Sequence, residues 1–481
     1  MQEKKKAASL KFAGGRYLRY NGKMNEIRQK LAKLGIEIPE ILLPRNNNLR
    51  HWAAIACDQF TQDRSYWERA AMAADDQPSA LNLIFPEAFL AEGDRSVRIG
   101  DIHRTMRNYL DSGIFAPGRR GFVYLERDTP FNRGRKGLVA AVDLERYDWS
   151  PSARPLIRAT EGTVAERLPP RVDIRRNAPI ETQHILLLID DDTDTLLPAI
   201  GERAKKAPPV YQGELMLNCG SVSGWMFDFE DNAPPGEGVT FLAEKLEELA
   251  QRAMTRYGAA GEEPFLFAVG DGNHSLASAK AVWDEYKAAH TAEDGAQNIL
   301  HCGTLDHPCR YALVEIENIY DPAITFEPIH RAAFGLGFDQ TLKLLAALPG
   351  FSSRPLAGRE EMSALVAEPV KGNRFGIIAG NRCALIETSA GGISTASLQP
   401  LLDSAGVVLD YIHGEDELFR LATSDGTGAA HGTATGILLP PVQKAGFFET
   451  VARCGPLPRK SFSMGEAEEK RFYIECRRLF G

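Results

Sequence analysis

The segment "GDGNHS", residues 270–275, gathers residue types that could bind an anion. It follows an apolar run, "FLFAV", and precedes an alanine-rich segment of good helix formers, so the pattern predicts a strand, a loop and a helix. Glycine lets backbone N–H groups approach a ligand closely, and the first turn of a helix offers free N–H groups and a favourable dipole. We therefore predict a phosphate-binding loop. The alternative is a tight turn with a helix cap and no ligand.

Each residue of this loop has an expected role. The two glycines would adopt positive φ and bring the backbone to the ligand. Asparagine and histidine would donate hydrogen bonds, the serine would cap the helix, and the aspartate would hold a metal or accept a substrate hydroxyl proton. The sequence is neither a Walker A motif nor a dinucleotide-binding G-x-G-x-x-G. We expect Gly270, Gly272, Asn273 and Ser275 to bind the cofactor, and Asp271 and His274 to be catalytic.

A phosphate group bound at this loop would also need cations nearby, and a reaction at a hydroxyl group would need a base. "LIRATEG" offers Arg158 as a phosphate ligand and Glu161 as the general base, with a solvated, salt-bridging carboxylate as the alternative for Glu161. "FEPIHR" and "LPRKS" add further phosphate-binding candidates, namely His330, Arg331 and Lys460.

The segment "ACDQFT" places Cys57 and Asp58 after an apolar stretch. A nucleophilic cysteine needs a base and a lowered pKa, so we favour a buried structural role for Cys57 and substrate binding for Asp58. "HCGTLDHPC" contains zinc-competent residues, but their spacing matches neither usual paired arrangement. We predict no metal site formed by protein ligands alone.

The elements that must position these residues alternate along the chain. Amphipathic helices are expected over 25–34, 64–74, 98–112 and 239–257, and strands over 120–128, 135–147, 182–191 and 309–320. The runs around 120–128 and 135–147 flank a turn-prone segment and indicate an antiparallel pair, whereas "ILLLI" is typical of a buried central strand. The sequence predicts an α/β (α+β) fold with a mixed sheet and flanking helices.

Composition limits the function classes. The net charge is −8 in 481 residues, which argues against nonspecific binding to nucleic acid or to an anionic membrane. The seven cysteines are scattered, and no apolar run has the length of a membrane span, so we expect a cytoplasmic protein. We divide the chain into a disordered extension at 1–23, a main α/β core at 24–336 and a C-terminal α/β region at 337–481 packed on the core.

Several long strings resemble a family of bacterial and archaeal proteins with a domain of unknown function, numbered 1015. They are "WAAIACDQFTQDRSYW", "SALNLIFPE", "GLVAAVDLERYDW", "LIRATEGTVAERLPPR", "FEPIHR", "DYIHGEDEL" and "LPRKSFSMGEAEEKRFY". In the family's D-G-H-H-R motif, Asn273 here replaces the first histidine and Ser275 the arginine. A compensating cation must then come from elsewhere, and Arg158, Arg331 and Lys460 are the candidates.

The D-G-x-H loop also resembles the nucleotide loop of the ParB/sulfiredoxin superfamily, whose members hold ATP or CTP phosphates and in some cases phosphorylate free serine. This resemblance implies ATP or another nucleotide with Mg²⁺, and a kinase-like reaction on a small hydroxylated metabolite such as a free amino acid. The alternative is a nucleotide- or metabolite-binding regulatory protein without turnover. We expect a small-molecule substrate, no nucleic-acid or membrane partner, and allow for a homodimer.

Overall fold

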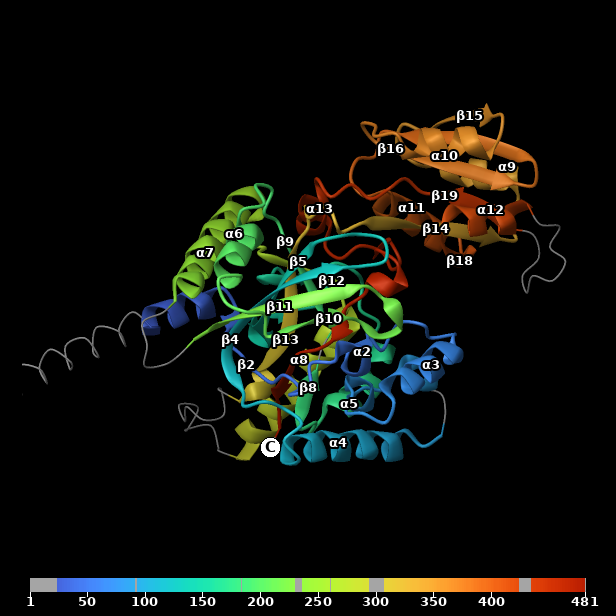
Figure 1. Ribbon diagram of the computed structural model, residues 1–481. Coiled ribbons are helices and arrows are strands. Elements are labelled where there is room, and N and C mark those ends of the chain that lie inside the picture. Colours follow the sequence, from blue (N-terminus) through green and yellow to red (C-terminus); the bar gives the residue numbers. More distant parts are fainter. Residues whose placement is uncertain are drawn as a thin grey trace, which may run out of the picture. The chain divides into compact units, whose positions relative to one another are not determined.

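The computed structural model describes residues 24–480, except 91–92, 183, 230–235, 260, 294–306 and 424–433 (Figure 1). The extension expected at 1–23 lies outside the described residues. The chain forms two compact units. Unit 1 comprises Met1–Ala159, Thr163–Ile324 and Ala467–Gly481, and unit 2 comprises Thr160–Gly162 and Thr325–Glu466.

These boundaries differ from the division expected at residue 336. Strand β14 (Phe326–Phe334) belongs to unit 2 because its hydrogen-bonded partners, β18, β19 and β20, all lie there. The last residues return to unit 1 because β21 (Phe472–Tyr473) pairs with β3 (Ala54–Ile55) and β22 (Cys476–Arg478) pairs with β8 (Ile180–Thr182). Sequence patterns do not reveal this return, because strand pairing joins segments more than 290 residues apart.

Unit 1 is built on an 11-stranded mixed sheet with the order β10-β11-β4-β5-β13-β9-β12-β7-β6, to which β1 and β2 add at β5 and β4. The remaining strands of unit 1 are β1 (Ile36–Glu37), β2 (Glu40–Ile41), β4 (Arg119–Asp128), β5 (Arg135–Asp143), β6 (Tyr147–Asp148), β7 (Ile157–Ala159), β9 (Leu186–Ile189), β10 (Tyr211–Glu214), β11 (Ser221–Asp228), β12 (Phe267–Asp271) and β13 (Tyr311–Asn318).

Some helices of unit 1 pack on this sheet and others pack on neighbouring helices. They are a helix at 24–33, α2 (Leu49–Trp52), α3 (Arg64–Ala74), α4 (Arg95–Asp111), α5 (Leu168–Arg175), α6 (Leu196–Ala204), α7 (Glu237–Tyr257) and α8 (Asn273–Glu293). Helix α6 packs on β4, β5 and β11, and α7 lies beside α6 (Figure 1). The α/β class and the mixed sheet expected from the sequence are confirmed.

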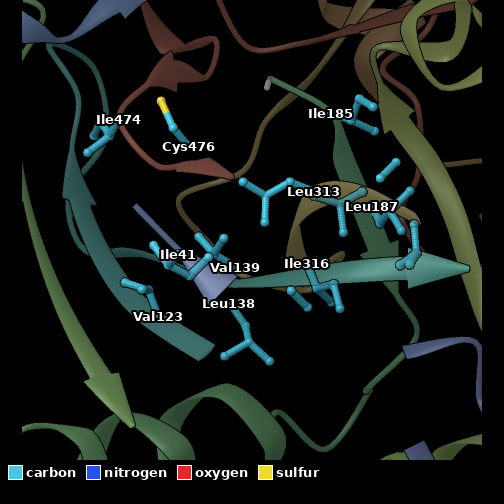
Figure 2. Close-up of a cluster of buried hydrophobic side chains, with 14 of the residues drawn as sticks. Ile41, Val123, Leu138, Val139, Ile185, Leu187, Leu313, Ile316, Ile474 and Cys476 are labelled. Atoms are coloured by element: carbon cyan, nitrogen blue, oxygen red, sulfur yellow. The ribbon is translucent and has the colours of Figure 1, made fainter. Parts of the chain in front are cut away.

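The core of unit 1 lies around the central strands. The four residues of β9 are all buried, as are seven consecutive residues of β5, so both faces of the sheet are covered there. Side chains from β4, β5, β9 and β13 gather in this core, among them Val123, Val139, Leu187 and Leu313 (Figure 2). The antiparallel β4–β5 pair and the buried β9 confirm two sequence predictions.

Unit 2 contains a 7-stranded sheet with the order β15-β17-β16-β19-β14-β18, and β20 pairs with β14. Two clusters of buried side chains form its core. Besides β14, its elements are α9 (Phe338–Leu345), β15 (Ser352–Leu356), α10 (Arg359–Ala367), β16 (Asn373–Ala379), β17 (Arg382–Thr388), α11 (Ser394–Ser404), β18 (Val408–His413), α12 (Glu415–Thr423), β19 (Ala434–Leu438), α13 (Phe447–Cys454) and β20 (Phe462–Met464).

Within the described ranges, no helix has the length and apolarity that crossing a membrane requires.

Candidate functional site

The predicted strand, loop and helix are present in unit 1. Strand β12 ends at Asp271, and α8 begins at Asn273. Gly272 joins them with φ of +80°, and a β-carbon there would lie 3.1 Å from the Cα of Ile185. A side chain at this position would therefore be strained by its backbone and crowded by its neighbour.

Two expectations for the loop are wrong in detail. Gly270 lies inside β12 at a β-bulge, and it is not among the described residues with positive φ. The conformational freedom of Gly270 therefore allows the irregular pairing of β12 with β9 and does not form a left-handed turn. Ser275 is the third residue of α8 and not its cap, because the helix starts three residues earlier than expected. Its hydroxyl lies 3.2 Å from Nε2 of His184 instead.

The first helical residue, Asn273, is the clearest sign of a ligand. The residue is 8% exposed, and the Oδ1 atom of its side-chain amide is buried without a hydrogen-bond partner among the described residues. A buried polar group without a partner costs roughly 1–3 kcal/mol, so such groups mark sites where another molecule binds. The next residue, His274, accepts a hydrogen bond at Nε2 from the backbone N–H of Val164.

The register of the sheet brings further residues to this loop. Strand β9 runs antiparallel to β12 with Leu186 opposite Asp271, so His184, just before β9, lies beside the loop. Strand β7 runs parallel to β12, and their carboxyl ends share one edge. Ligands commonly bind at the carboxyl ends of parallel strands in α/β sheets.

The β3–β21 ladder contributes another side of the site. Tyr473 pairs with Ala54, and the N–H of Ala56 donates to the carbonyl of Arg471. The residues that follow β3 therefore lie next to those that precede β21. This places Asp58 and Lys470 at the same end of the ladder.

His184 is the centre of the resulting polar network. Its Nδ1 lies 2.7 Å from the hydroxyl of Tyr473, and its Nε2 lies 3.9 Å from Oδ2 of Asp58 as well as near Ser275. The Tyr473 hydroxyl also accepts a hydrogen bond from the N–H of Cys57. The ring is held at both nitrogens, which fixes its orientation.

The electrostatics of this network favour an ionised Asp58. Burial alone would raise the pKa of Asp58, but His184, the Gln59 side chain, Lys470 and Arg171 together hold the pKa below its ordinary value. By contrast, burial raises the pKa of the Cys57 thiol to about 12, and Asp58 adds to this shift. A protonated thiol is a poor nucleophile, which agrees with a structural role for Cys57.

Two cations lie near the loop. Nζ of Lys470 is 3.5 Å from Oδ2 of Asp271, and Arg171 on α5 forms an ion pair with Glu87. Burial raises the pKa of Glu87 although Arg171 opposes the shift. The sequence predicted neither Lys470 nor His184 nor Tyr473 as functional. The only signal for Lys470 and Tyr473 was their place in the string "EEKRFY", which assigns no role.

Some of these residues line a cavity of about 120 Å³, whereas Asp58, Asp271, Asn273 and Lys470 are not part of its lining. One wall is apolar and includes Phe85, Met106 and Ile185. The polar wall is formed by Cys57, Arg171, His184, Ser275, Ser278 and Tyr473. Pockets that enclose a whole drug-sized ligand measure ~300–1,000 Å³, so this cavity suits a small molecule or one group of a larger ligand.

Arg158 lies at the opposite end of β12 from the loop. Its Nε donates to the carbonyl of Pro155, its Nη2 is 3.7 Å from Glu262, and its guanidinium lies over the ring of Phe265. Burial lowers the pKa of Arg158. The side chain therefore supports the start of β12 and does not supply the cation that Ser275 lacks.

The other predicted residues belong to unit 2. Oε1 of Glu161 accepts a hydrogen bond of 2.5 Å from the backbone N–H of Lys460. The structure thus brings these two residues together through the backbone of Lys460, whose φ is +56°. Glu161 remains a predicted base and Lys460 a predicted phosphate ligand.

His330 and Arg331 are buried within unit 2. Nδ1 of His330 accepts from the N–H of Leu439, and burial lowers the pKa of His330 to about 4, so the ring is neutral near pH 7. Arg331 is fully buried and donates to Gln399 and to the carbonyl of Ile329. Neither side chain offers an accessible cation, because both are occupied by contacts inside the unit.

No group of three or more metal-binding side chains occurs among the described residues. Of the zinc-competent residues examined, His301 and Cys302 lie outside the described ranges, and His307 is 2.9 Å from the sulfur of Cys309. Mg²⁺ is commonly held by one or two carboxylates together with substrate phosphates. Asp58 and Asp271 fit that pattern, so Mg²⁺ remains a prediction.

The sequence profile described as "Protein of unknown function (DUF1015)" matches residues 41–405. No curated protein matches the sequence. Among solved structures, a free serine kinase in complex with AMP is 11% identical and covers 71% of this chain and 92% of its own, with a TM-score of 0.33. A conserved hypothetical protein from Pyrococcus furiosus (12% identity, 71% and 95% coverage, TM-score 0.31) and C-terminally truncated SbnI from Staphylococcus aureus (10%, 70% and 86%, 0.32) are similar to the same degree. With TM-scores this low, these likenesses establish neither fold nor function.

Proposed function

Since this chain belongs to the DUF1015 family of proteins of unknown function, we propose a function from the geometry of unit 1. The proposal is a nucleotide-dependent phosphotransferase that acts on a small hydroxylated metabolite such as a free amino acid. The observation that carries it is the start of the 21-residue helix α8 at Asn273, directly after the positive-φ turn at Gly272. A helix N-terminus with free donors is suited to a phosphate group.

The surrounding residues fit the parts that phosphoryl transfer requires. The backbone at Gly272 and the amide of Asn273 would hold the phosphoryl group, and Lys470 and Arg171 would supply positive charge. Asp58, kept ionised, would accept a hydrogen bond from the acceptor hydroxyl or bind Mg²⁺ beside Asp271. The cavity of about 120 Å³ would hold the acceptor, with the rest of the nucleotide outside it.

In this reaction, the bond between the terminal phosphorus and its bridging oxygen breaks, and a new bond forms to the acceptor oxygen. The acceptor proton passes to a base. Glu161 is the base predicted from sequence, and His184 is a second candidate because Nε2 faces Ser275 and Asp58. The variants Glu161→Gln and His184→Gln distinguish the two candidates. The base is the residue whose replacement lowers kcat and leaves KM unchanged.

The decisive experiment incubates the full chain with ATP, Mg²⁺ and a panel of free amino acids, and measures ADP and phosphorylated product. We expect product with at least one hydroxylated acceptor. Asn273→Ala should weaken ATP binding roughly tenfold, equal to about 1.4 kcal/mol. The control Asn82→Ala changes an exposed amide of unit 1 and should leave binding unchanged.

If the chain binds ATP but forms no product, the protein is a nucleotide-binding regulatory protein and not an enzyme. Absence of ATP binding, or full affinity in Asn273→Ala, would overturn the role of the loop itself.

A further inference from the structure

Unit 2 has an open surface cavity of about 440 Å³ that the reaction proposed for unit 1 does not use. It lies between the N-terminal ends of α11 and α13 and the start of β16. We propose that this cavity binds a small organic anion, a carboxylate or phosphate monoester on an apolar body. The inference is independent of the phosphotransferase proposal.

The anion-binding end is the N-terminus of α11. This helix is 11 residues long, and its preceding residue, Ile393, has no side chain that could cap it. The first residue, Ser394, lines the cavity and is 4% exposed, yet its hydroxyl has no partner in the described part of the chain. A buried hydroxyl that faces a cavity and the free N–H groups of a helix are both left without an acceptor.

A cation lies beside these donors. Arg453 on α13 lines the same cavity, and it makes no ion pair or hydrogen bond with any described residue. A β-carbon placed on Gly392 would be 3.8 Å from Nη2 of Arg453 and 3.5 Å from Oγ1 of Thr450. The guanidinium therefore points at the segment that enters α11. Two positive groups, the exposed guanidinium of Arg453 and the N-terminus of α11, lie at the same end of the cavity, and a bound anion would interact favourably with both.

Glycine keeps this end of the cavity open. Gly392 has φ of +84°, and a side chain there would enter the space between Arg453 and Thr450. Gly446, which precedes α13, has φ of +81° and also lines the cavity. Both turns expose backbone rather than side chains to the ligand.

The rest of the cavity defines the ligand's body and charge. Its volume exceeds the need of an inorganic anion, and Val366, Ile393, Pro440 and Pro441 give it apolar walls. The other charged residues of the lining are Arg374, Glu368 and Glu449, and Arg374 is paired with Glu368 and with Glu387, which lies outside the lining. The carboxylates of Glu368 and Glu449 would repel a highly charged nucleoside triphosphate, whereas a small anion can lie beside Arg453.

Binding of matched small probes to the full chain tests the proposal. The anionic probes are 3-phenylpropionate and phenyl phosphate, and the uncharged controls are 3-phenylpropionamide and phenol, all measured by calorimetry. We expect one or both anions to bind with Kd of about 1 mM or tighter and the uncharged controls to bind at least tenfold more weakly. The stronger anion identifies carboxylate or phosphate as the natural head group.

Two variants locate the site. Arg453→Gln should weaken anion binding about tenfold, and Ser394→Ala should weaken it several-fold. The control Arg420→Gln removes an exposed arginine of α12 outside the lining and should have no effect. Equal binding of charged and uncharged probes, no anion binding, or full affinity in both cavity variants would overturn the proposal. Thermal melts of each variant confirm that unit 2 is folded.

Discussion

At the scale of single residues, the candidate site of unit 1 depends on how His184 is held. Tyr473 contacts one ring nitrogen, while Asp58 and Ser275 lie by the other. Tyr473 itself is fixed by the N–H of Cys57 and by its place in β21. Replacing Tyr473, Asp58 or Ser275 would therefore remove a direct neighbour of the His184 ring.

Replacing Tyr473 by phenylalanine removes the hydroxyl that contacts His184 and leaves the N–H of Cys57 without its acceptor. We expect the free energy of unfolding to fall by roughly 1–3 kcal/mol and any turnover to fall at least tenfold. Chemical denaturation and kinetics measure the two effects. Tyr66→Phe is the matched control, because the buried hydroxyl of Tyr66 has no partner among the described residues and its removal should cost little. Equal losses in both variants would contradict the role of Tyr473.

At the scale of elements, the sequence predicted β12, its loop and α8, because apolar runs, glycines and helix formers are local signals. It also placed Asp58 at the end of a buried segment. It did not predict His184, Lys470 or Tyr473 at the site. Their positions depend on the register of β9 against β12 and of β21 against β3, and periodicity does not encode which strands pair. Helix start sites also depend on tertiary contacts, so the predicted start of α8 differs from the observed one by three residues.

Gly272→Ala tests why the loop needs glycine. The added β-carbon would meet Ile185 and take a positive φ, so we expect a loss of stability of about 2–3 kcal/mol together with weaker ligand binding. Gly113→Ala is the control: its φ is +67°, but nothing lies within 4 Å of the added carbon. Its loss should be only about 1 kcal/mol. Denaturation curves compare the two, and equal losses would show that crowding by Ile185 is unimportant.

Strand β13 carries two buried acids into the core of the sheet. Burial, together with Glu315 and Asp321, raises the pKa of Glu317 to about 8 although Arg135 opposes the shift. Because the pKa of Glu317 is higher in the folded chain than in the unfolded chain, protonation of Glu317 stabilises the fold. This contribution is fully present below the ordinary pKa of a glutamate and is lost as pH rises through about 8. We expect stability to decline between about pH 5 and pH 8 and the decline to be smaller in Glu317→Gln. Denaturation at a series of pH values measures this, and parallel profiles would refute it.

At the scale of the whole molecule, unit 1 is assembled from segments on both sides of unit 2 in the sequence. The segment after unit 2 supplies Lys470 and Tyr473 to the site and two strands, β21 and β22, to the unit. Unit 2 has its own sheet and its own buried clusters. Each unit therefore has the internal packing that independent folding requires.

A truncated chain that ends at Glu466 should destabilise unit 1 and leave unit 2 folded. Without its last segment, unit 1 loses the partners of β3 and β8 and the hydroxyl that holds His184. We expect limited proteolysis to digest unit 1 rapidly and to leave a resistant fragment beginning near Thr325. The full chain is the control. Equal resistance of unit 1 in both chains would contradict a structural role for the terminal strands.

Because residues 467–481 belong to unit 1, ribosomal synthesis of unit 1 is completed only after unit 2 has been made. A growing chain makes most of unit 1 first, then all of unit 2, and only afterwards the two strands that complete unit 1. During that interval, β3 and β8 present unpaired edges, and the pocket around His184 has no Tyr473. The time needed to synthesise unit 2 therefore separates the synthesis of the first residues of the site from that of the last. Synonymous codon changes that slow translation of unit 2 would lengthen the exposure of those edges and favour aggregation of the nascent chain, with no change in the mature protein.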